Sequence, residues 1–173
     1  MRSRSRNICI CAAFSAIGIL VAYLESFIVL PVRIPGIRIG LANIVTLIAL
    51  YLMGPVYAAV ILIVRVALSA LLFGSLTSFV YSISGAFLAF LSMIVVKRSG
   101  FSICCVSVTG AVFHNTGQIL AASVIVSNRY VFMYLPVLVL TAVIFGMLTG
   151  VLGRIMIDRL GSVVYLGERE GIK

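Results

Sequence analysis

The chain has 173 residues, of which 63% are hydrophobic and 10% are charged, and its formal net charge is +9. A soluble domain of this size cannot bury so much apolar surface, so the composition excludes a soluble globular protein and predicts a one-domain integral membrane protein. The basic residues lie at the ends of apolar segments rather than in a stripe with interleaved aromatic residues, which excludes nucleic acid as the expected partner.

The first apolar segment follows a basic N-terminus and therefore resembles the start of a signal peptide. However, the apolar run continues to Leu30 and is interrupted only by Glu25 and Ser26, with no small-x-small cleavage motif before a polar sequence. We therefore expect a retained first membrane helix.

Five further apolar segments follow, each near the roughly 20 residues that a helix needs to cross a bilayer. Strands of a membrane barrel would be about 10 residues long with alternating polarity, so these longer runs favour helices. Pro55 and Pro136 suit the first turns of two of them. The expected fold is an all-α bundle of six transmembrane helices, at about residues 8–30, 39–53, 55–73, 76–96, 103–127 and 134–157, with a cytoplasmic tail at 158–173.

The distribution of lysine and arginine predicts that both termini are cytoplasmic in the plasma membrane. In this orientation three basic residues, Arg33, Arg38 and Arg129, are external, and Arg65 lies within the third helix. The cytoplasmic set is larger and consists of Arg2, Arg4, Arg6, Lys97, Arg98, Arg154, Arg159, Arg169 and Lys173.

Most polar side chains inside the helices fall between the bilayer midplane and the external side, which predicts a polar pocket there. A charge within a spanning helix costs about 2.5–3.5 kcal/mol on insertion scales, so Glu25 and Arg65 need partners. One interpretation is a buried ion pair that fixes helix packing. The other is a pair that lines the pocket and meets a charged ligand.

Between the first two helices, the segment PVRIPGIRIG (31–40) contains two prolines and two glycines, which prevent a continuous helix. It is either an ordinary turn or a lid over the pocket. As a lid, its Arg33 and Arg38 would attract an anionic or carbonyl-rich solute. Asn43 opens the apolar run that follows.

The fifth helix carries His114, Asn115 and Gln118 at spacings that predict one shared side. They would hydrogen-bond a planar ligand, or they would join helices. A metal site is not expected, because His114 is the only histidine and no acidic residue is near it in sequence. Tyr81 is expected to stack on a ring of the solute. The candidate substrate-binding residues are Glu25, Arg33, Arg38, Asn43, Arg65, Tyr81, His114, Asn115 and Gln118.

Enzymatic chemistry and bound cofactors are not expected. The chain has four acidic residues and lacks an aspartate cluster, a glycine-rich phosphate loop and a Ser–His–Asp arrangement. All four cysteines are predicted near the cytoplasmic face, where disulfides are disfavoured. They are interpreted as small buried residues, with a redox role as the alternative.

Three segments, 24–54, 65–90 and HNTGQ at 114–118, resemble the Gx transporter family, which is often labelled heptaprenyl diphosphate synthase component I. The resemblance spans about Leu20 to Gly150. It implies a relation to the substrate-binding S components of energy-coupling-factor (ECF) vitamin transporters. Those proteins have six helices and cytoplasmic termini, and they enclose the ligand with the outer helix ends and the loop after the first helix.

The same resemblance implies partners. S components contact a coupling subunit through an Ala-x-x-x-Ala pattern on the first helix, which Ala12 and Ala16 match, and separate ATPases supply energy. We therefore expect a substrate-binding subunit, surrounded by membrane lipid, for uptake of a small vitamin-like or cofactor-precursor solute. The alternative is an accessory membrane subunit of quinone or heptaprenyl diphosphate synthesis, or of flavin-based extracellular electron transfer, with synthase or flavoprotein partners.

Overall fold

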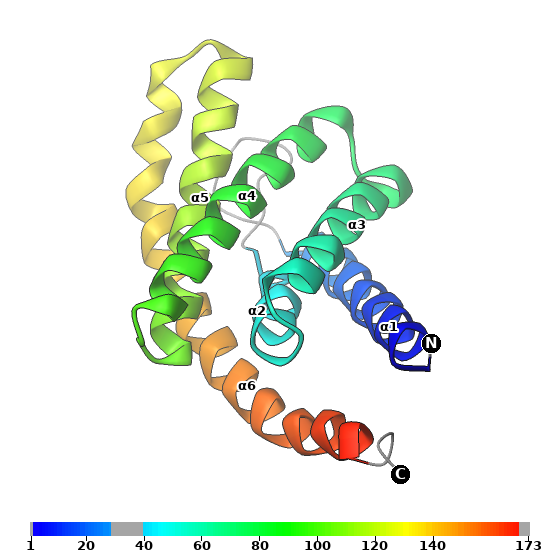
Figure 1. Ribbon diagram of the computed structural model, residues 1–173. Coiled ribbons are helices and arrows are strands. Elements are labelled where there is room, and N and C mark those ends of the chain that lie inside the picture. The colour runs from blue at the N-terminus through cyan, green and yellow to red at the C-terminus, as the bar shows by residue number, and fades with distance from the viewer. Residues whose placement is uncertain (1, 29–39, 170–173) are drawn as a thin grey trace.

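The computed structural model of the protein describes residues 2–28 and 40–169, with side chains at 5–28 and 40–161 (Figure 1). Every regular element within these ranges is helical, which confirms the predicted all-α class. The elements are α1 (Arg2–Glu25), α2 (Asn43–Leu52), α3 (Pro55–Phe73), α4 (Leu76–Arg98), α5 (Ile103–Val126), the 3-10 helix η1 (Arg129–Tyr134) and α6 (Leu135–Arg169).

Five of the described helices are long and apolar enough to cross a membrane, namely α1, α3, α4, α5 and the segment formed by η1 and α6. This confirms a multi-pass membrane type of chain. The remaining α-helix, α2, has 10 residues and is therefore only about 15 Å long, half of a ~30 Å hydrocarbon core. Six spanning helices thus stay a prediction. The last helix continues through the predicted tail to Arg169.

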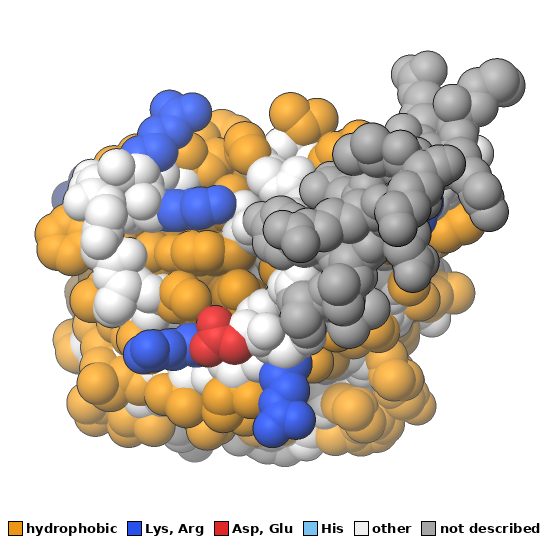
Figure 2. All heavy atoms as spheres, turned by 60° about the horizontal axis from the view of Figure 1, so that its bottom comes forward, with side chains coloured by type: hydrophobic (Ala, Val, Ile, Leu, Met, Phe, Trp, Pro, Cys, Tyr) orange, Lys and Arg blue, Asp and Glu red, His pale blue; other side chains and the backbone are white. Residues whose placement is uncertain are grey.

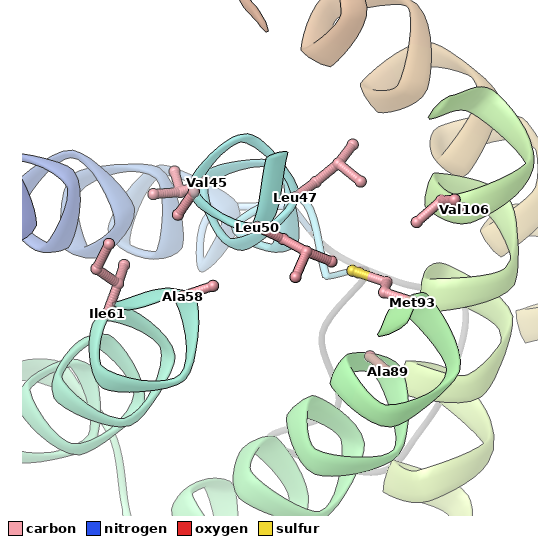
Figure 3. Close-up of a cluster of buried hydrophobic side chains, with 9 residues drawn as sticks. Val45, Leu47, Leu50, Ala58, Ile61, Ala89, Met93 and Val106 are labelled. Atoms are coloured by element: carbon pink, nitrogen blue, oxygen red, sulfur yellow. The ribbon is translucent and has the colours of Figure 1, made fainter. Parts of the chain in front are cut away.

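The short helix α2 lies at the centre of the bundle and packs against each of the other five α-helices. It is buried on all sides, as expected for a helix that is apolar all round. Figure 3 shows its side chains directed toward α3 on one side and toward α4 and α5 on the other. Together with side chains of α3, α4 and α5 they form a buried hydrophobic cluster. It consists of Val45, Leu47, Ala49, Leu50, Ala58, Ile61, Ala89, Met93 and Val106.

Two polar contacts bring several helix ends together at the lower end of the bundle in Figure 1. The side-chain amide of Asn7 donates to the Tyr57 hydroxyl at 3.3 Å, which joins the starts of α1 and α3. Lys97 Nζ donates to the Leu50 carbonyl at 2.6 Å and lies 4.5 Å from the centre of the Tyr51 ring, which joins the ends of α4 and α2.

The lower end of the bundle carries several basic side chains, including Arg6, Lys97 and Arg98, whereas Arg129 begins η1 at the other end. Figure 2 shows lysine and arginine side chains distributed over this lower face among apolar ones. Such an asymmetry is what the positive-inside rule predicts for a cytoplasmic end. The orientation of the bundle in a membrane stays a prediction.

Glycines allow α5 to approach both α4 and α6 closely. A methyl group on Gly117 of α5 would lie 2.7 Å from the Ser84 carbonyl oxygen and 2.8 Å from Gly85 Cα, both backbone atoms of α4. On α6, a methyl group on Gly146 would lie 2.8 Å from Val108 Cα. The Gly146–Gly150 spacing therefore marks a packing face against α5, as small-residue spacings do in membrane helices.

We expect Gly117→Ala to lower the free energy of unfolding by about 1–3 kcal/mol, because the added methyl group meets backbone and forces α4 and α5 apart. Unfolding of the purified protein in detergent measures this. Gly161→Ala is the matched control. Its methyl group would meet only Leu52 Cδ2, at 3.8 Å, and alanine favours the helix. Equal stability of the two variants would contradict the close α4–α5 packing.

Candidate functional site

The buried carboxylate of Glu25 joins the end of α1 to the start of α2. Glu25 is 4% exposed, and its two oxygens accept hydrogen bonds from the backbone N–H groups of Gly40 and Ala42, the latter at 3.3 Å. The N-cap residue of α2, Ala42, offers no side-chain acceptor, and the first turn contains no acidic residue. Glu25 therefore supplies from α1 the negative group that the positive N-terminus of α2 favours.

Arg65 connects the same turn of α2 to α3. Its Nη2 donates to the Asn43 side-chain oxygen at 3.2 Å, and the residue is 6% exposed. Its aliphatic stem lies against Gly18 of α1, where a methyl group would come within 2.6 Å of Arg65 Cδ. The absence of a side chain at position 18 thus leaves room for the arginine between α1 and α3.

A small polar cavity lies where these groups face α4 and α5. Its volume is about 20 Å³, somewhat more than the about 10–15 Å³ that one water molecule needs. The lining combines charged, hydroxyl and imidazole groups with small apolar side chains: Ala22, Glu25, Arg65, Val66, Ser69, Ala70, Ser78, Ser82 and His114.

Three serines of this lining were not among the sequence-based candidates. Ser69 is 3% exposed, and its hydroxyl has no hydrogen-bond partner in the described part of the chain. The sequence signal that could have identified these serines was their spacing from other polar residues. Ser69 follows Arg65 by four residues and Ser82 follows Ser78 by four, so each pair shares a helix face. Serine is common at helix contacts in membranes, which makes this signal weak.

His114 reaches the cavity from α5 and is held by Gln118 one turn further along. The Gln118 amide nitrogen lies 2.8 Å from His114 Nε2, and both residues are buried. An amide nitrogen can only donate, so the imidazole nitrogen is the acceptor. His114 also lies beside the turn before α2, because a methyl group on Gly40 would come within 2.8 Å of its Cδ2.

Two sequence-based candidates lie away from the cavity, although they are buried. Asn115 donates from Nδ2 to the Leu138 carbonyl of α6 at 2.7 Å, so it joins two helices. Tyr81 packs in an apolar cluster that includes Ile119 and Leu138. The structure therefore brings together Glu25, Asn43, Arg65, His114 and Gln118. Arg33 and Arg38 lie outside the described residues.

The remaining candidate residues lie on outer surfaces. Ala12 and Ala16 are exposed on α1, which packs mainly on α2 and α3. The interpretation of the cysteines as buried residues is wrong for Cys9 and Cys105, which are exposed because they lie on outward helix faces. No group of three potential metal ligands occurs among the described residues.

A second hollow, an open groove of about 430 Å³, lies between α4 and α5. Its lining is apolar apart from Ser84, which suits the hydrocarbon of surrounding lipid. The lining residues are Val80, Ser84, Phe87, Leu88, Gly117, Leu120, Ala121, Val124 and Ile125.

The comparison with protein families identifies the family of this chain. Residues 14–156 match the family described as heptaprenyl diphosphate synthase component I. The chain belongs to this family. The matched range contains every residue that lines the polar cavity. Searches of curated proteins and of solved structures find no match.

We expect Glu25→Gln to lower the free energy of unfolding by about 1–3 kcal/mol, because the amide group carries no charge and its nitrogen cannot accept from a backbone N–H. Chemical unfolding in detergent measures the loss. Asp158→Asn, on an exposed side chain of α6, is the control and leaves stability unchanged. A Glu25→Gln variant as stable as the wild type would show that the carboxylate does not hold the two helices.

Proposed function

We propose that the protein is a membrane-embedded substrate-binding subunit that resembles an S component of ECF transporters. It takes up a small vitamin-like or cofactor-precursor solute and is energised by partner subunits. The observation that carries this proposal is the polar cavity built by α1, α3, α4 and α5 inside a largely apolar bundle. Ionisable groups at such depth are costly and mark solute or ion sites in membrane proteins.

The position of the cavity supports capture from outside. Glu25 ends α1, Asn43 begins α2, and Ser78 lies in the first turn of α4, so the cavity lies toward the end of the bundle opposite the basic face. With the basic face cytoplasmic, the cavity is in the external half of the membrane. The sequence-based proposal adds Arg33 and Arg38, which lie outside the described residues, to this site.

The size of the cavity implies movement on binding. Pockets for small molecules measure about 300–1,000 Å³, whereas this cavity measures about 20 Å³, so the helices around it must separate to admit a whole solute. Helix α1 is the element best able to move, because it packs mainly on α2 and α3. Its exposed Ala12 and Ala16 form the proposed contact with a coupling subunit, and separate ATPases supply the energy.

A second candidate function follows from the family description. The protein would be an accessory, non-catalytic membrane subunit in quinone or heptaprenyl diphosphate synthesis, or in flavin-based extracellular electron transfer. Prenyl diphosphate synthesis depends on magnesium held by clustered aspartates, and the chain has one aspartate, Asp158. Catalysis would therefore belong to a partner, and the polar cavity would serve helix packing or a quinone head group.

Native mass spectrometry of the gently purified protein distinguishes the transport function from the accessory function. We expect a co-purified small molecule whose occupancy falls at least about tenfold in Arg65→Gln, since this change removes a charged donor from the cavity. Arg98→Gln, on an exposed residue at the opposite end, is the control and keeps the ligand. Thermal unfolding confirms that both variants are folded.

Two results would contradict the transport proposal. Unchanged occupancy in both Arg65→Gln and Arg38→Ala would show that the ligand lies elsewhere. A protein that carries no small molecule and co-purifies with a prenyl synthase or a flavoprotein, instead of coupling and ATPase subunits, would establish the accessory function.

A further inference from the structure

The hydroxyl of Ser69 makes no hydrogen bond to another described residue. It lies in the wall of the polar cavity, is almost fully buried, and has no hydrogen-bond partner in the described part of the chain. A buried polar group without a partner is costly, and replacing it by an apolar group is often neutral or stabilising. The position of Ser69 therefore indicates a hydrogen bond that forms only when the cavity is occupied.

The groups around Ser69 are rich in hydrogen-bond donors. Arg65 lies one turn before it on α3, and Ser78 and Ser82 face it from α4. The arginine is a permanent cation with a planar set of N–H donors that matches carboxylate and phosphate oxygens. Hydroxyls add donors that rotate to suit the ligand.

The carboxylate of Glu25 also lines the cavity, but its oxygens are hydrogen-bonded to backbone groups at the start of α2. Both of its oxygens accept backbone N–H groups, from Gly40 and Ala42, at the positive N-terminus of α2. The α2 terminus thus offsets this negative charge. The donors on α3 and α4 face the cavity from other helices.

We infer that the cavity binds an anionic oxygen group, a carboxylate or a phosphate, at one end of the solute, with the Ser69 hydroxyl as one of its donors. This inference rests on the proposed function and names the substrate class of that site. A volume of about 20 Å³ is little more than one water molecule needs, so the walls move apart to take this terminal group and the remainder of the solute lies outside the cavity.

Thermal unfolding of the full chain in an uncharged detergent tests the inference, with acetate and inorganic phosphate as probes. Acetamide has the shape of acetate without its charge, and chloride keeps the ionic strength equal. We expect acetate, phosphate or both to raise the Tm in a saturable manner, and acetamide to leave it unchanged. An equal response to acetamide, or none to either anion, would overturn the inference.

Ser69→Ala separates binding from folding. Without a probe its Tm should equal or exceed that of the wild type, because the substitution removes a buried hydroxyl that lacks a partner. Its apparent affinity for the anion should fall by about tenfold or more, the usual loss for a hydrogen bond to a charged group. Ser84→Ala, on the α4 surface that lines the apolar groove, should keep the wild-type affinity.

Three further results would count against the assignment. Unchanged affinity in Ser69→Ala would exclude this hydroxyl as a donor. A lower Tm of ligand-free Ser69→Ala would make the hydroxyl a structural group and would overturn its assignment to a ligand. Loss of the acetate response on adding anionic lipid would assign the site to a lipid phosphate rather than a solute.

The failures of this inference and of the proposed function are distinguishable. A solute without an anionic group, found by native mass spectrometry, would overturn the inference while supporting transport. A response to acetate that Ser69→Ala weakens, in a protein that captures no solute and binds no coupling subunit, would leave an anion site whose function is not uptake.

Discussion

The arrangement of the helices depends on one interaction, the burial of the Glu25 carboxylate at the N-terminus of α2. A carboxylate inside an apolar bundle needs donors, and the backbone N–H groups of Gly40 and Ala42, just before α2 begins at Asn43, supply them. The positive N-terminus of α2 in turn favours the negative charge of Glu25. Because Arg65 of α3 donates to Asn43 in the same turn, three helices meet at one polar point.

This polar point separates two parts of the bundle that differ in their buried side chains. From Val45 onward α2 is buried among apolar side chains, which gives the basic half a close-packed core (Figure 3). In the other half, charged and hydroxyl side chains surround a cavity. The wall of this cavity is held where α1 meets α2, because Glu25 bonds to Gly40 and Ala42, and Asn43 bonds to Arg65.

Membership of the heptaprenyl diphosphate synthase component I family does not by itself indicate catalysis. The chemistry that the family description implies needs clustered carboxylates, whereas the buried carboxylate of Glu25 is bonded to backbone N–H groups. The described side chains around the cavity are the basis of the proposal that the site recognises a solute. Arg65, Ser69 and His114 offer hydrogen bonds without an arrangement of nucleophile and base.

The sequence by itself determined the membrane class, the approximate helices, the basic end and the family, because these depend on local composition and charge. Helix rotation was decided only by the tertiary structure. His114 and Asn115 were predicted on one side, yet adjacent residues point about 100° apart, so His114 faces the cavity while Asn115 bonds α6. Helices that are apolar all round carry no pattern that fixes this rotation, and for the same reason only packing could show that Glu25 caps α2.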